Sequence, residues 1–161
     1  MGKCNLKIIA TTAATWTCLT TAVAAECSVD ELSMRGAFGS VRFDVSVADD
    51  NAERAQGLMF VEEMGTLEGM LFVFERPHRA TFWMRNTLIP LDMIFVGADG
   101  VVDHIHPMAV PHDETPIPGG DAIQYVFEIN GGMAERLGLS VGNELQHPSI
   151  IGDVAWPCEN I

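Results

Sequence analysis

Short apolar segments separated by glycine and proline constrain most strongly what this chain can fold into. Residues 41–47 alternate apolar and polar side chains without a break, which is typical of a half-buried strand. Residues 69–74 form a continuous apolar run of strand length. An Asp-Gly step between two more apolar runs predicts a hairpin. The remaining predicted strands are residues 80–84, 91–96, 101–105, 122–129 and 144–147.

Helical segments are few and short. Residues 52–56 follow capping residues and end at Gly57, and residues 132–137 end at Gly138, so each predicts a short helix. Residues 107–120 hold four of the eight prolines, which predicts a long loop. Together these segments predict a mainly β fold, either a β-sandwich or a partly open barrel, with one or two short helices.

The first 25 residues have the order of a secretory signal peptide. A basic start with Lys3 and Lys7 precedes a mildly apolar run, and the small residues 22–25 fit a cleavage site. The alternative is an uncleaved anchor, but the run holds six threonines and is too polar for a stable span of about 20 apolar residues. We expect residues 1–25 to be removed and residues 26–161 to form one β domain, exported to the periplasm or secreted.

The acidic composition excludes some classes of partner. The whole chain carries 9 Lys and Arg against 22 Asp and Glu, a net charge of −13. Removal of the signal peptide takes both lysines, and the 7 remaining arginines against 22 acids leave −15. Such a chain repels nucleic acid and anionic membrane surfaces. We therefore expect no nucleic-acid partner and no stable membrane anchor after cleavage.

Two cysteines, Cys27 and Cys158, lie close to the two ends of the expected mature chain. In an oxidising compartment an even pair predicts a disulfide. The alternative is two free thiols in the terminal tails. Closing so long a loop contributes about 4–5 kcal/mol in the chain-entropy model.

A series of motifs in fixed order carries a family resemblance. The motifs are RAQGLMF at 54–60, EGMLFVF at 68–74, FWMRNT at 82–87, PLDMIF at 90–95, EINGG at 128–132 and LGLSVG at 137–142. They strongly resemble the domain-of-unknown-function 192 family over about residues 41–145. The resemblance implies a β-sandwich of jelly-roll type, often behind a signal peptide. It implies no reaction.

The segment at residues 83–87 is the first candidate for a functional site. Trp83 offers an apolar face, Arg85 a fork of donors, and Asn86 both a donor and an acceptor, a set that suits a carboxylate, phosphate or sugar. We hypothesise that they line one cleft with the charged residues of neighbouring motifs, Arg54, Glu68 and Asp92. The alternative is structural. In that case the arginines pair with those acids, Asn86 satisfies a turn and Trp83 fills the core.

A metal site is the second candidate. His104 and His106 place two imidazoles on one face of a predicted strand, and Met108 follows. Imidazole and thioether together suit copper in an exported protein. However, Cys-x-x-Cys and His-Glu-x-x-His motifs are absent, and methionine more often packs in a core. We expect no metal and no other cofactor, and keep copper as an alternative.

A binding module is the function that the sequence favours. It would hold a small polar or anionic ligand, or a partner segment, at the Trp-Met-Arg-Asn segment. The first alternative is a hydrolase-type enzyme that uses a carboxylate of the same cleft, with Asp92 or Glu68 as general base; a scaffold or partner protein is another. Several acids, among them Glu62, Glu63 and Glu128, could pair across a glycosidic bond, but the sequence gives no spacing for them in space.

Overall fold

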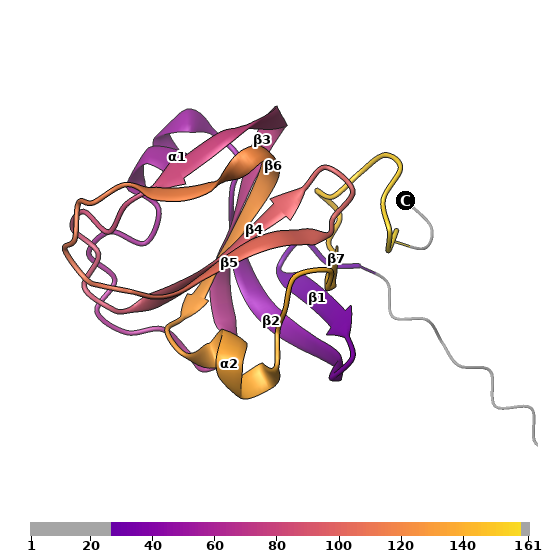
Figure 1. Cartoon of the computed structure of the whole chain (residues 1–161), viewed down its shortest axis with the longest axis horizontal. Coiled ribbons are helices and arrows are strands. Elements are labelled where there is room, and N and C mark those ends of the chain that lie inside the picture. Colours follow the sequence, from indigo (N-terminus) through magenta and orange to yellow (C-terminus); the bar gives the residue numbers. More distant parts are fainter. Residues whose placement is uncertain (1–26, 159–161) are drawn as a thin grey trace, which may run out of the picture.

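The computed structural model describes residues 27–158, so the expected signal peptide lies outside the described residues. Within them, seven strands and two short helices follow one another (Figure 1). The strands are β1 (Glu31–Gly36), β2 (Gly39–Ala48), β3 (Glu68–Phe82), β4 (Leu91–Gly97), β5 (Val102–Ala109), β6 (Ile117–Asn130) and β7 (Glu144–Gln146). The helices are α1 (Asn51–Gln56) and α2 (Met133–Leu137).

All seven strands belong to one sheet, in the order β5-β4-β6-β3-β2-β1-β7. β2 and β3 pair in parallel, and the other described neighbours pair antiparallel. A bridge between Val101 and Glu144 brings β7 beside the start of β5, where the Leu145 amide donates to the Gly100 carbonyl at 2.8 Å. The sheet therefore curls into a half-barrel, and the prediction of a mainly β fold with two short helices is confirmed.

β6 lies in the middle of the sheet, and its side chains alternate between two cores. Phe127 and Ile129 face a core that β1, β2 and α2 help to form. Val126 packs on the other side, in a second core with Met93 and Phe95 of β4. Because successive strand residues point to opposite faces, Glu128 lies on the Val126 side. This second core forms the floor of the candidate site.

Two predicted strands, residues 69–74 and 80–84, are one continuous strand, β3. Pairing with β6 shifts its register between Val73 and His78 and then resumes as far as Phe82. Such an irregularity accommodates Pro77, which cannot donate to the ladder. The hairpin predicted between β4 and β5 is present, and Gly100 takes the positive φ of 77° that its turn requires.

The two cysteines of the described residues are joined, as expected. Cys27 and Cys158 form a disulfide with their Cα atoms 5.8 Å apart. No helix of residues 27–158 is long and apolar enough to cross a membrane.

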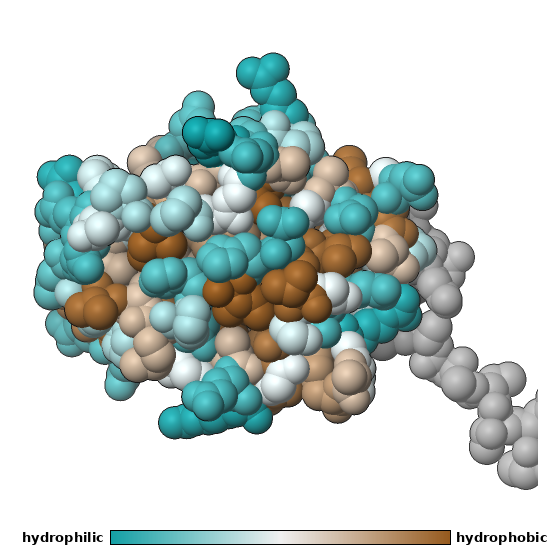
Figure 2. Space-filling model, in the orientation of Figure 1, coloured by the Kyte–Doolittle hydropathy of each residue, from teal (hydrophilic) through white to brown (hydrophobic). Residues whose placement is uncertain are grey.

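Apolar side chains also reach the surface. Figure 2 shows several of them on one face, set among polar residues. Phe60, Val110 and Trp83 are among the large apolar residues with 67%, 62% and 47% of their surface exposed. Isolated exposed apolar residues are ordinary in folded proteins. Trp83 is of more interest because it lines a cavity.

Candidate functional site

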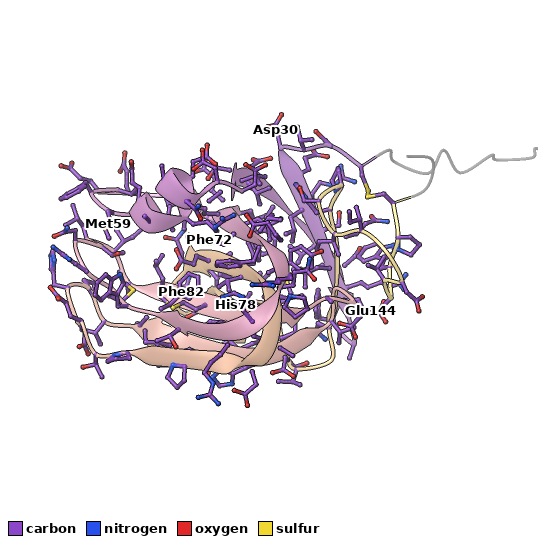
Figure 3. All side chains as sticks on the ribbon, turned by 90° about the horizontal axis from the view of Figure 1, so that it is seen from above. Asp30, Met59, Phe72, His78, Phe82 and Glu144 are labelled. Atoms are coloured by element: carbon purple, nitrogen blue, oxygen red, sulfur yellow. A yellow bond between two sulfur atoms is a disulfide. The ribbon has the colours of Figure 1, made fainter. Side chains whose placement is uncertain are left out.

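A cavity of about 430 Å³ opens on the side of the sheet that carries α1. This volume falls within the range of small-molecule sites. Figure 3 shows Phe72, Phe82 and His78 between α1 and the strands. The lining residues come from α1, β3, β6 and the segments that follow α1 and β3. They are Asn51, Arg54, Ala55, Gln56, Gly57, Leu58, Met59, Phe72, Phe74, His78, Arg79, Thr81, Phe82, Trp83, Arg85, Thr87 and Glu128.

Helix α1 forms one wall because it is capped firmly at its start. The Asp50 carboxylate accepts hydrogen bonds from the amides of Ala52 and Glu53 at 2.7 and 2.8 Å. The Glu53 side chain reaches back to the Asp50 amide, which completes a capping box. This helix presents Arg54 to the cavity.

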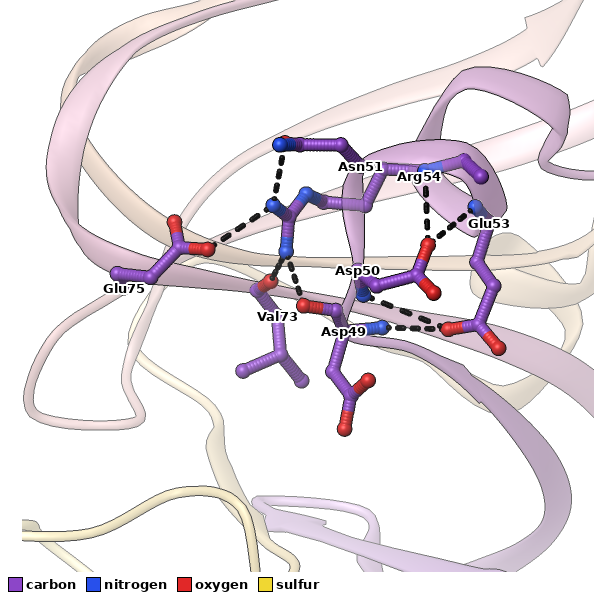
Figure 4. A network of polar contacts seen from close by, with 8 residues as sticks. Asp49, Asp50, Asn51, Glu53, Arg54, Val73 and Glu75 are labelled. Carbon is purple, nitrogen blue, oxygen red and sulfur yellow. Dashed lines mark hydrogen bonds and ion pairs between the residues drawn. The ribbon is translucent and has the colours of Figure 1, made fainter.

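The Arg54 guanidinium is held by protein groups through both of its terminal nitrogens (Figure 4). It donates to the Val73 carbonyl at 2.6 Å, to Asn51 at 2.9 Å and to Glu75 at 3.0 Å. It also lies 5.1 Å from the centre of the Phe74 ring, and 9% of its side chain is exposed. A backbone hydrogen bond lowers the pKa of Glu75, and the hydrogen bond and charge of Arg54 lower it further. Arg54 therefore holds α1 against β3.

Trp83 and Arg85 lie together at the cavity. They flank Met84, which is fully buried, so the two neighbours point outward. The Arg85 guanidinium carbon is 5.6 Å from the Trp83 ring centre, within the range of a cation–π contact. Within residues 27–158, no carboxylate forms an ion pair with Arg85. This arginine is a cation available to a ligand.

The other three residues predicted for this site do not line the cavity. Asn86 occupies a turn with a φ of 54°, and its carbonyl accepts from the Phe60 amide at 2.9 Å. Glu68 is exposed and accepts from the Gly65 amide at 2.7 Å. The turn role expected for Asn86 under the structural alternative fits this geometry. The pairing of Arg54 with Glu68 or Asp92 does not, because its partner is Glu75.

Asp92 is fully buried and serves the fold. One carboxylate oxygen accepts from the amides of Met108 and Gly132 at 2.8 and 2.9 Å, and the other accepts from Ala134 at 2.7 Å. Gly132 begins α2 without a side-chain cap of its own. Asp92 thus caps α2 from a neighbouring strand, on the face opposite Met93. Asp92 is therefore not among the residues that line the cavity with Arg85.

The carboxylate that does line the cavity is Glu128. Only 4% of its surface is exposed. Burial raises the pKa of the Glu128 carboxyl from 4.5 to about 8, and no hydrogen bond or cation opposes this rise. At neutral pH the side chain is therefore largely protonated. The signal in the sequence was an acid inside the apolar run at residues 125–129.

A second polar group, His78, was not anticipated as a site residue. Its ring lies 4.2 Å from the Phe74 ring centre, and its buried Nδ1 has no hydrogen-bond partner in the described part of the chain. His78 pairs with Ile123, five residues before Glu128 on β6. At about 3.4 Å per residue, Ile123 and Glu128 are about 17 Å apart along β6. His78 and Glu128 therefore mark different ends of the cavity.

The copper alternative receives little support from the geometry. His104 and His106 lie on β5, opposite Phe95 and Met93. A register shift follows His106, and the Met108 sulfur lies against Gly131 and Gly132 at the start of α2. The bulge therefore turns Met108 away from the two imidazoles. Within residues 27–158 no three His, Cys, Asp or Glu side chains gather as metal ligands.

Residues 33–147 match the model of the DUF192 family, which is described as an uncharacterised ACR. This match covers more than half of the chain. The protein belongs to the DUF192 family. The resemblance read from the motifs at residues 41–145 is thereby confirmed, and the match extends to β1 at one end and β7 at the other.

Two solved structures of relatives share the DUF192 fold. A protein of unknown function from Novosphingobium aromaticivorans DSM 12444 is 49% identical, with 71% of this chain and 82% of that chain covered and a TM-score of 0.70. A protein from Sinorhizobium meliloti 1021, described as a "putative transcription regulator", is 36% identical. There the coverage is 78% of this chain and 98% of that chain, with a TM-score of 0.73. No curated protein matches the chain.

Proposed function

We propose that this DUF192 protein is a binding module for a small organic anion with an apolar, aromatic body. The observation that carries the proposal is the pair of Trp83 and Arg85 on one cavity of about 430 Å³, with Arg85 unpaired among the described residues. A planar guanidinium can take a carboxylate or phosphate by two parallel hydrogen bonds.

The walls of the cavity support an apolar body for the ligand. Phe72, Phe74 and Phe82 line it, and edge contacts fix the Phe82 ring against Phe72 at 5.2 Å and against Phe95 at 5.8 Å. Fixed aromatic walls are typical of small-molecule sites, and the polar lining residues between them can orient a ligand. The cavity is therefore already shaped before any ligand enters.

The net charge of −13 opposes an anionic ligand at long range. This opposition is weak at physiological salt, because screening reduces interactions between exposed charges beyond about 8 Å. The local charge at Arg85 then decides the affinity. The same net charge disfavours DNA as a ligand of this chain.

The test uses 4-benzylbenzoate, an aryl carboxylate that matches this description. In a chain with Trp16→Phe and Trp156→Phe, Trp83 is the remaining tryptophan and reports binding by its fluorescence. We expect saturable binding that weakens about tenfold to a hundredfold in Arg85→Gln, because a charge-assisted contact contributes about 1.5–3 kcal/mol. The uncharged 4-benzylbenzamide should bind more weakly.

The matched control is Arg42→Gln. Arg42 is a half-exposed arginine on β2 that pairs with Glu31 and does not line the cavity. The Arg42→Gln substitution removes the same charge from the protein and should leave binding unchanged. Equal affinities in the two arginine variants, or no saturable signal at millimolar probe, would refute the proposal.

Hydrolysis in the same cavity is a second candidate, because the raised pKa of Glu128 suits a general acid. Binding is preferred because Glu128 is the one carboxylate among the described lining residues. Glycosidases of the usual kind need two carboxylates. Turnover of 4-nitrophenyl glycosides that disappears in Glu128→Gln would favour the enzyme over the binding module.

We further propose that the module works outside the cytoplasm, in the periplasm or the medium. The disulfide supports this location, because such bonds persist in oxidising compartments. Fractionation of cells that make the full chain, with detection of the cleaved form by mass, tests it. A full-length chain confined to the cytoplasm would contradict it.

A further inference from the structure

Glu128 has no polar neighbour directly opposite it on either adjacent strand, β3 or β4. Met70 of β3 and Met93 of β4 stand directly opposite it in the sheet. A thioether is at best a weak acceptor and donates nothing. Burial raises the pKa of Glu128, and no hydrogen bond or charge within residues 27–158 opposes this rise. The carboxyl therefore has its hydrogen-bonding capacity free toward the cavity that it lines.

The charged and titratable groups around this cavity do not compensate Glu128. They are Arg54 of α1, His78 and Arg79 of β3, and Arg85 after β3, while β4 contributes none to the lining. Arg54 is held by Val73 and Glu75, and Arg79 pairs with Asp121 at 2.7 Å. Arg85 lies over Trp83. His78 pairs with Ile123 of β6, which is five residues away from Glu128 along that strand.

An unpaired carboxyl at this place lowers the stability of the fold, since a buried polar group without a partner is unfavourable. A methionine would continue the row of Met70 and Met93 without that penalty. A ligand atom that satisfies the carboxyl removes the penalty upon binding. The cavity wall therefore favours a ligand whose inner end complements this group.

We propose that Glu128 determines the specificity of the cavity by donating a hydrogen bond from its protonated carboxyl to a carbonyl oxygen of the ligand. The inference rests on the proposed function and names its ligand more closely. The ligand is an aromatic or apolar carboxylate that carries a ketone or amide carbonyl at its inner end. Its anionic end meets Arg85.

Proton linkage follows from this arrangement. The carboxyl can donate only while it holds its proton, and the pKa of Glu128 is about 8. Above that pH each further unit reduces the protonated fraction about tenfold. A carboxylate would also repel the carbonyl oxygen. The preference for a carbonyl-bearing ligand is therefore expected to decline in alkaline solution.

The experiment compares 4-benzoylbenzoate with 4-benzylbenzoate by calorimetric titration. The two probes share the carboxylate and both rings, and differ in a ketone against a methylene group. Their affinity ratio therefore cancels pH effects on the shared anionic end. We expect the wild-type chain to prefer the ketone at pH 6.5, and the preference to be about tenfold smaller at pH 9 than at pH 7.

Two substitutions at Glu128 separate the roles of the proton and of the side chain. Glu128→Gln keeps a donor, so the ketone preference should persist but lose its dependence on pH. Glu128→Met keeps the volume without a donor, so the preference should vanish. His78→Asn is the control for the other titratable group of the cavity and should retain the wild-type pH profile.

The outcomes distinguish the two proposals. If 4-benzylbenzoate binds through Arg85 but the ketone preference is absent, survives in Glu128→Met or grows with pH, the role of Glu128 is wrong and the binding module stands. Growth with pH would indicate a ligand that donates to a carboxylate. If neither probe binds, both proposals fail.

Discussion

Replacement of Asp92 by asparagine tests whether the Asp92 carboxylate caps α2. The substitution keeps the size of the side chain and one oxygen, so the amides of Met108 and Gly132 can still be satisfied. The new amide group then faces the Ala134 N–H, which donates to the second carboxylate oxygen at 2.7 Å in the native chain. Two donors meet, and a buried N–H of α2 loses its acceptor.

The magnitude follows from these three contacts. Loss of one charge-assisted hydrogen bond costs about 1.5–3 kcal/mol, and the other two become neutral and weaker. Asparagine avoids the burial of a charge, which offsets part of this loss. We expect the free energy of unfolding to fall by about 2–4 kcal/mol.

Urea unfolding followed by circular dichroism measures this change. The control is Asp121→Asn, which makes the same substitution in an exposed ion pair with Arg79. That variant should stay within about 0.5 kcal/mol of the wild type. A loss below about 1 kcal/mol for Asp92→Asn, with an unchanged slope in urea, would refute the reasoning that Asp92 caps α2.

Three further predictions concern stability. Because the folded pKa of Glu128 is about 8 and its ordinary value is 4.5, wild-type stability should fall by about 1.4 kcal/mol per pH unit between those values relative to Glu128→Gln. Urea midpoints of the two chains at pH 5.5, 7 and 8.5 test this, and parallel curves would contradict it. Reduction of the Cys27–Cys158 bond should lower stability by up to about 5 kcal/mol, given a sequence separation of 131 between the two cysteines. Urea midpoints with and without reductant measure this change, and an unchanged midpoint would argue against the bond. Gly119→Ala should prevent native packing, since the new Cβ would lie 2.0 Å from the Phe95 ring. A thermal midpoint equal to that of the wild type would show that the ring can move aside.

Local sequence signals predicted the parts of the fold that depend on neighbours in the chain. The alternation at residues 41–47 predicted a strand where the structure has β2, and the Asp-Gly step predicted the turn between β4 and β5. The two helices followed from their capping residues and glycines. Such patterns are set by backbone geometry over a few residues, so a single sequence contains them.

The candidate site depends on registers between strands that are distant in sequence. Asp92 and Glu128 both sit in apolar runs, and the sequence does not say which faces the cavity. Pairing of Asp92 with Ile129 and of Met93 with Glu128 decides it, because side chains opposite each other point to the same face. The irregular pairing of β3 after Val73 likewise brings His78 to the cavity without any local signal.

The bond between Cys27 and Cys158 makes the described polypeptide a covalent ring. Residues 110–116, which join β5 to β6, are mostly exposed and offer a protease its simplest point of attack. One cut there opens the ring into a single linked molecule whose new ends lie in that loop. Two cuts are needed before any fragment can leave, so a nicked molecule retains all seven strands in one covalent piece.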